Sequence, residues 1–167
     1  MDLTEGNLAN HPFLKGLSEE HLKILDDCSM KRVFEPGEVI FREGDLANRF
    51  YLILSGSVLL ESPCENEPPS TIQTIKAGDV LGWSWLFPPY NWHFDARALE
   101  RTEAIFLYGT RIRAKCEEQP ALGYELVKRM AMVLMQRLQA TRKELVKTRH
   151  ALDLAQRRGM APVPSGD

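Results

Sequence analysis

The stretch Phe34-Glu35-Pro36-Gly37-Glu38-Val39-Ile40-Phe41-Arg42-Glu43-Gly44-Asp45 sets short apolar runs between two turn signals. Proline fixes φ and glycine accepts a positive φ, so Glu35–Glu38 and Glu43–Asp45 predict tight turns. Outward from this stretch, Lys31 to about Tyr108 alternates β-rich runs with turns roughly every 8 to 12 residues. This spacing is typical of an all-β sandwich or barrel.

The same pattern predicts the individual elements. Strands are expected at residues 33–34, 39–41, 50–54, 58–60, 71–75, 96–99 and 104–107. Glu61–Ser70 is polar and holds three prolines, which favours a surface loop. Residues 11–29 are expected to form a helical lead-in, with Ser18 as the N-cap before Glu19 and Glu20.

Composition narrows the class of protein. The chain has 167 residues, 44% hydrophobic and 26% charged, with a formal net charge of -2, ordinary values for one globular domain. No apolar run approaches the roughly 20 residues of a membrane-spanning helix, and no secretory signal is visible. Three distant cysteines fit a reducing compartment better than a disulfide framework, so we expect a cytoplasmic protein.

The C-terminal part differs from the rest in charge and in hydrophobic period. Residues 122–158 carry nine Lys or Arg and three acids, a charge of +6, which leaves -8 for the remainder. Apolar or small residues recur there at alternating spacings of four and three, which predicts a long helix with a dimer seam. The predicted interface residues are Val127, Ala131, Leu134, Leu138, Thr141, Leu145, Thr148 and Leu152.

The opening stretch, followed by Tyr51-Leu52-Ile53-Leu54-Ser55-Gly56, resembles the cyclic nucleotide-binding domain of the catabolite activator protein, its oxygen-sensing relatives and protein kinase A regulatory subunits. The resemblance covers residues 13–115. It implies a mainly β fold, a jelly-roll barrel with an N-terminal helix and a long C-terminal helix that pairs two subunits. The expected organisation is a β-roll at 11–120, a dimerisation helix at 121–158 and a disordered tail at 159–167.

Ala77–Gly82 resembles the approach to this family's phosphate-binding cassette, and we call residues 82–94 the cassette. The resemblance implies three binding elements: a glycine that opens a short helix, a glutamate for the ribose and an arginine for the phosphate. Gly82 is present, but Trp83 stands at the glutamate position, and Trp92 or His93 at the arginine position. Because a buried phosphate needs a partner, we expect no cAMP or cGMP binding in the usual way.

Six of the fourteen aromatic residues lie in the cassette, which leaves two interpretations of it. In the first, flat side chains line a pocket for a small planar or hydrophobic ligand. In the second, they fill the pocket and leave a ligand-free interaction or scaffold protein; a cyclic nucleotide binder with an unusual cassette is a further alternative. The candidate pocket residues are Gly82, Trp83, Ser84, Trp85, Leu86, Asn91, Trp92, His93 and Phe94.

No enzyme signature and no metal-ligand spacing occurs in the sequence, and no cofactor is predicted with certainty. His93 is a pH-sensitive polar contact, a haem ligand or a hydrogen-bonded core or rim residue, and Asp95 can pair with Arg97. The basic helix is either a solvated outer face around the seam or a contact for an acidic partner or a nucleic acid backbone. Only nine residues follow Arg158, so DNA binding by a helix-turn-helix is not expected. We expect a non-enzymatic regulatory or sensory homodimer that signals to an unidentified effector protein.

Overall fold

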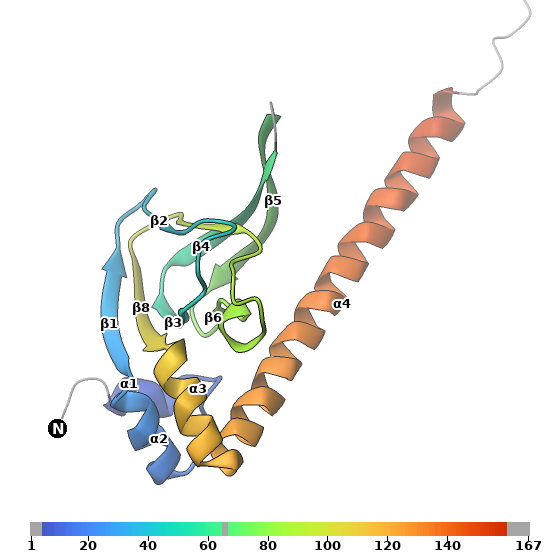
Figure 1. Ribbon diagram of the computed structural model, residues 1–167. Helices are drawn as coiled ribbons and strands as arrows, with labels where there is room; N and C mark the ends of the chain where they lie inside the picture. The colour runs from blue at the N-terminus through green and yellow to red at the C-terminus, as the bar shows by residue number, and fades with distance from the viewer. Residues whose placement is uncertain (1–4, 65–66, 160–167) are drawn as a thin grey trace, which may run out of the picture. The chain divides into compact units, whose positions relative to one another are not determined.

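The computed structural model describes residues 5–64 and 67–159, where eight strands form two four-stranded antiparallel sheets (Figure 1). The strand order is β1-β8-β3-β6 in one sheet and β2-β7-β4-β5 in the other. The strands are β1 Ser29–Phe34, β2 Val39–Phe41, β3 Arg49–Ser55, β4 Ser57–Cys64, β5 Glu67–Lys76, β6 Val80–Leu81, β7 Asp95–Ala98 and β8 Thr102–Tyr108.

The core lies between the two sheets because apolar side chains alternate along the strands. In β4 and β7, Val58, Leu60, Ala96 and Ala98 are buried while their neighbours are partly exposed, as the two-residue period of a strand requires. The inner face of the other sheet contributes Phe34, Tyr51, Ile53, Ala104 and Phe106 to the same cluster. The predicted jelly-roll β barrel with flanking helices is confirmed.

Glycine turns join the strands where the sequence predicted them. Gly37 has φ 84° and Gly56 has φ 83°, values that L residues rarely adopt. Gly56 also lies so close to β8 that an added Cβ would stand 2.5 Å from Thr102 Oγ1. The turn between β3 and β4 therefore admits no side chain.

The surface loop predicted at Glu61–Ser70 is wrong. β4 continues to Cys64 and pairs with β5, which begins at Glu67. β5 is an edge strand with a single neighbouring strand. Pro68 and Pro69 have no N–H to donate, but at an edge they interrupt no hydrogen bonds between inner strands. Pro63 lies beyond Glu61, the last β4 residue paired with β7. The prolines were therefore poor evidence against strands at this edge.

Short helices gather at one end of the roll (Figure 1). They are α1 Glu5–Asn10, α2 Glu19–Asp26 and α3 Gly109–Glu118, and a single 3-10 turn, η1 Ser84–Leu86, follows β6. The lead-in predicted at 11–29 is confined to α2, whose N-cap is Ser18 as predicted. The His21 N–H donates to Ser18 Oγ over 3.2 Å.

The long C-terminal helix is present as α4, Pro120–Gly159. The chain forms two compact units, residues 1–128 and 129–167, and α4 contributes to both. Leu122 and Leu126 on α4 are buried, whereas Leu138 is 70% and Leu145 58% exposed. The predicted tail lies outside the described residues apart from Gly159. No helix among the described residues is both long and apolar enough to cross a membrane.

Candidate functional site

Trp92 occupies the centre of the cassette. Its ring lies on Gly82, where an added Cβ would stand 2.7 Å from Trp92 Cζ3, and Gly82 has φ 87°. The other face of the site is Phe41 of β2, whose ring stacks on Trp92 with centroids 3.8 Å apart and planes 9° apart. Trp92 is 4% exposed. Trp92, one of the two residues expected at the family's arginine position, is therefore an apolar plug over Gly82.

The backbone holds Trp92 in place through the loop between β2 and β3. The Trp92 N–H donates to the Asp45 carbonyl over 2.9 Å, and the Trp92 carbonyl accepts from the Gly44 N–H over 2.9 Å. Between the same two loops, the Ala47 N–H donates to the Tyr90 carbonyl over 2.6 Å. The first two bonds satisfy both the N–H and the carbonyl of Trp92, and so fix the backbone that carries the indole.

A second group of cassette residues lies at the surface. Ser84 Oγ is 3.1 Å from His93 Nδ1, and Ser84 is buried while His93 is exposed. Trp83 is half-buried and stacks on the His93 ring at 4.9 Å. His93 is thus a rim residue with a hydrogen-bond partner, which is one of the roles expected for it.

The remaining predicted residues point elsewhere. Trp85 is fully buried and stacks on Phe50 of β3 at 4.7 Å. Phe94 belongs to the core between the sheets, 5.9 Å from Phe41. Leu86 is half-buried and Asn91 is exposed. The nine predicted residues therefore divide among the core, the far side of β3 and the rim.

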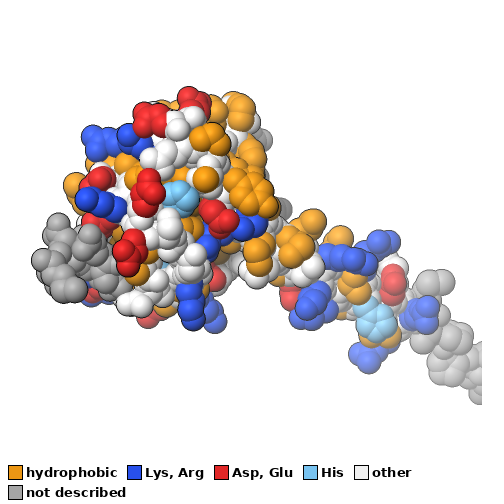
Figure 2. Space-filling view, turned by 90° about the horizontal axis from the view of Figure 1, so that it is seen from below, with side chains coloured by type: hydrophobic (Ala, Val, Ile, Leu, Met, Phe, Trp, Pro, Cys, Tyr) orange, Lys and Arg blue, Asp and Glu red, His pale blue; other side chains and the backbone are white. Residues whose placement is uncertain are grey.

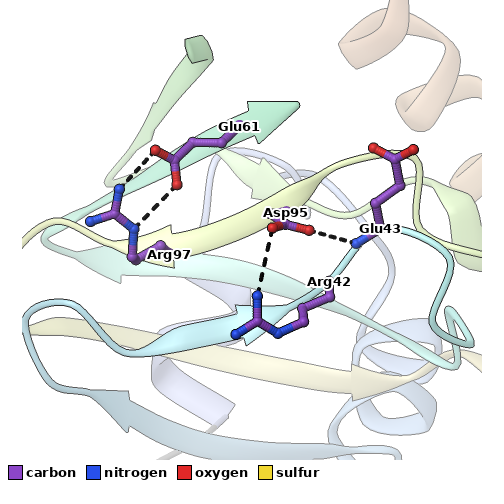
Figure 3. Close-up of polar contacts among 5 residues, drawn as sticks. All are labelled: Arg42, Glu43, Glu61, Asp95 and Arg97. Atoms are coloured by element: carbon purple, nitrogen blue, oxygen red, sulfur yellow. Dashed lines mark hydrogen bonds and ion pairs between the residues drawn. The ribbon is translucent and has the colours of Figure 1, made fainter. Parts of the chain in front are cut away.

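Asp95 and Arg97 do not pair with each other, contrary to the sequence prediction. Figure 3 shows Arg97 bound to Glu61 of β4, with Nη2–Oε1 at 2.7 Å and Nε–Oε2 at 3.2 Å. Asp95 accepts from the Glu43 N–H at 2.7 Å and lies 3.8 Å from Arg42 Nη1 (Figure 3). Both residues thus join neighbouring strands, which is a structural role.

A cavity of about 240 Å³ adjoins Trp92, and its lining includes no other predicted pocket residue. Arg32, Arg49 and Tyr51 line it together with Phe41. Burial raises the pKa of Tyr51, while the positive charges of Arg49 and Arg32 act in the opposite direction. Sequence reasoning missed these residues. The available signal was their strand parity, since Arg32 and Arg49 each lie two residues from an inward aromatic.

Other titratable residues have structural surroundings. His11 is buried, with Nε2 3.3 Å from the Ile53 carbonyl and Nδ1 accepting from the Phe13 N–H at 3.2 Å. Burial lowers the pKa of His11. Burial raises the pKa of the thiols of Cys28 and Cys116. Among residues 5–64 and 67–159, no group of three or more His, Cys, Asp or Glu is placed to hold a metal.

Comparison with known proteins agrees with this architecture. The model of the cyclic nucleotide-binding domain matches residues 31–119. The chain is 27% identical over 134 residues to the cyclic AMP receptor protein of Thermus thermophilus, covering 80% of this chain and 60% of that protein. The chain thus spans less than two thirds of this relative's length.

Solved structures share the fold. A Geobacter metallireducens protein named for cyclic nucleotide binding is 30% identical, with a TM-score of 0.75, covering 82% of this chain and 99% of that chain. A Trypanosoma brucei structure, described as the regulatory subunit of a cAMP-independent protein kinase A, is 27% identical with a TM-score of 0.63. The match with the Trypanosoma brucei structure covers 86% of this chain and 47% of the trypanosome chain. The chain therefore belongs to the cyclic nucleotide-binding domain family.

Proposed function

We propose that the chain is a non-enzymatic regulatory module whose cassette is closed by its own Trp92 and does not bind cAMP or cGMP in the usual way. The observation that carries this proposal is the position of the indole, in contact with Gly82 and stacked on Phe41. A nucleotide phosphate needs the N–H groups near this glycine and a cationic partner. An indole there excludes the phosphate and supplies no positive charge.

A relative supports the idea that this fold works without cAMP. The Trypanosoma brucei structure is described as part of a cAMP-independent kinase, so dependence on cAMP is not a property of every family member. We propose that output passes instead through α4 to an effector protein. Residues 122–158 carry a charge of +6 and the other residues carry -8, so the two parts of the chain offer surfaces of opposite charge to such a partner.

We also propose that α4 pairs two copies of the chain. The predicted seam residues are exposed in the single chain, except Leu134, which is half-buried. Figure 2 shows apolar side chains along α4, with basic ones gathered toward its C-terminal end. An exposed apolar stripe of this length is costly in water, and a parallel partner helix would cover it.

Cavity rescue tests the plug. Trp92→Ala removes the indole and leaves an apolar space, which small aromatic molecules enter readily. We expect free indole at about 1 mM, a range suited to weak small ligands, to raise the melting temperature of Trp92→Ala and not of the wild type. Trp83→Ala, at the half-buried rim, is the matched control and should show no rescue. Equal responses in all three proteins would contradict the plug.

A further inference from the structure

Two arginines of the β1-β8-β3-β6 sheet line the cavity: the Arg32 side chain is 50% exposed and Arg49 is half-buried. Arg32 shares the pleat side of buried Phe34, and Arg49 that of buried Tyr51. The Arg32 guanidinium lies 5.3 Å from the Phe34 ring centroid, and that of Arg49 lies 5.7 Å from the Phe106 ring centroid.

Their present partners leave positive charge in the cavity. Arg32 Nη2 is 3.4 Å from Glu38 Oε1, but this pair is exposed and surface pairs contribute little. Arg49 Nε donates to the neutral Asn48 Oδ1 at 3.0 Å, and Arg49 forms no ion pair among the described residues. The carboxylate of Asp45 also lines the cavity, but Asp45 is exposed.

Aromatic side chains line the cavity on the side of the cassette. Phe41 and Trp92 line this side, stacked on each other and held by the backbone bonds of the β2–β3 loop. At about 240 Å³ the space is smaller than the usual pocket for a drug-sized molecule and fits one or two fused rings. The Tyr51 hydroxyl adds a polar group between the aromatic wall and the two guanidinium groups.

We propose that this cavity binds a small planar aromatic carboxylate. The ring would lie against the Phe41 and Trp92 wall, and the carboxylate would meet the guanidinium of Arg49 with support from Arg32. Guanidinium and carboxylate groups match in geometry and form strong charge-assisted hydrogen bonds. This site goes beyond the proposed function: Arg32, Arg49 and Tyr51 lie outside the cassette, to which Trp92 alone of the lining residues belongs, and the site requires no contact through α4.

Ligand-observed NMR and calorimetry on the full chain test the proposal with indole-3-acetate as the probe. We expect saturable binding with a Kd of about 1 mM or below, in the range of small ligands. Indole-3-acetamide keeps the ring and removes the charge, and acetate keeps the charge and removes the ring. Both should bind at least about tenfold more weakly if ring and charge contribute together.

Matched variants locate the site. Arg49→Gln should weaken indole-3-acetate at least about tenfold. Arg42→Gln, which removes an exposed arginine paired with Asp95 (Figure 3), should leave binding unchanged. If Arg49→Gln fails to fold, Arg49→Lys keeps the charge without the planar fork and should bind more weakly than the wild type. No saturable binding, equal binding of the amide, or wild-type affinity in the folded Arg49 variant would each overturn the proposal. A parallel cAMP titration tests the closed cassette separately.

Discussion

The cassette and α4 each carry a set of apolar side chains, and the chain covers one set and leaves much of the other exposed. Trp85, Trp92 and Phe94 of the cassette are all less than 10% exposed, each stacked on or packed against a ring from a strand. On α4, Leu138 and Leu145 are more than half exposed. An apolar run thus indicates a binding surface only where the chain itself does not cover it.

This difference follows from geometry. A loop of thirteen residues between β6 and β7 can fold its rings onto β2 and β3, which lie beside it. A 40-residue helix extends about 60 Å at 1.5 Å per residue, and the side chains of its second half are exposed throughout. The cassette therefore completes a core, whereas the apolar side chains in the second half of α4 stay exposed in the single chain.

Removing the plug should have the largest effect on stability. Trp92→Ala deletes a buried, stacked indole and should lower the free energy of unfolding by about 3–5 kcal/mol. Urea unfolding followed by circular dichroism measures this loss. Trp83→Ala at the rim should cost far less, since Trp83 is only half-buried. Equal losses would mean that the cassette core does not depend on Trp92.

The second largest effect on stability should come from Gly82→Ala, which crowds the Trp92 ring. In Gly82→Ala the new Cβ meets the indole at 2.7 Å and φ is 87°. Gly37 has φ 84° with no atom within 4 Å of an added Cβ, so Gly37→Ala isolates the backbone cost, about 1–2 kcal/mol. Gly82→Ala should cost roughly 1–3 kcal/mol more than Gly37→Ala because of overpacking. The extra cost should vanish when Trp92 is alanine; its persistence would argue against the contact.

Breaking α4 should leave the roll intact. Leu138→Glu with Leu145→Glu places charges in the predicted seam and should convert a dimer to a monomer at tens of micromolar, measured by sedimentation equilibrium. Gln136→Glu with Ala140→Glu adds the same charge on the opposite side of the helix and should leave the dimer in place. A wild type that sediments as a monomer would refute the seam.

Lowering the pH should reduce the stability of the β-roll by less than these substitutions do. His11 has a folded-state pKa below its ordinary 6.5, so the unfolded chain takes up the proton first as the pH falls. Stability from neutral His11 is therefore fully present above about pH 6.5 and declines below it toward the lowered pKa. Thermal unfolding between pH 7 and pH 5 measures this decline. His11→Gln should flatten it, and an unchanged slope in that variant would assign the decline to other groups.

Much of the fold was predictable because its signals are local. Gly37 and Gly56 marked turns where the backbone needs positive φ, and Ser18 marked the start of α2. The extension of β4 and β5 was missed because Pro68 and Pro69 are tolerated only at an edge, and edge position is set by sheet order.

The candidate site was less predictable because it depends on long-range contacts. Trp85 and Trp92 are seven residues apart in the chain, yet one stacks on Phe50 and the other on Phe41. Composition places both in the cassette and cannot say which ring lies over Gly82. Arg32 and Arg49 were missed for a related reason: no local pattern shows that an exposed arginine of β1 and a half-buried arginine of β3 line the same cavity.

Isothermal titration of the wild-type protein with cAMP tests the central claim, that Trp92 closes the cassette, most directly. The protein should first be refolded, so that any carried ligand is removed. We predict no saturable heat with cAMP at concentrations up to about 1 mM, equivalent to binding weaker than about -4 kcal/mol. Saturable binding with a micromolar Kd would show that the indole yields to the nucleotide and would contradict the account.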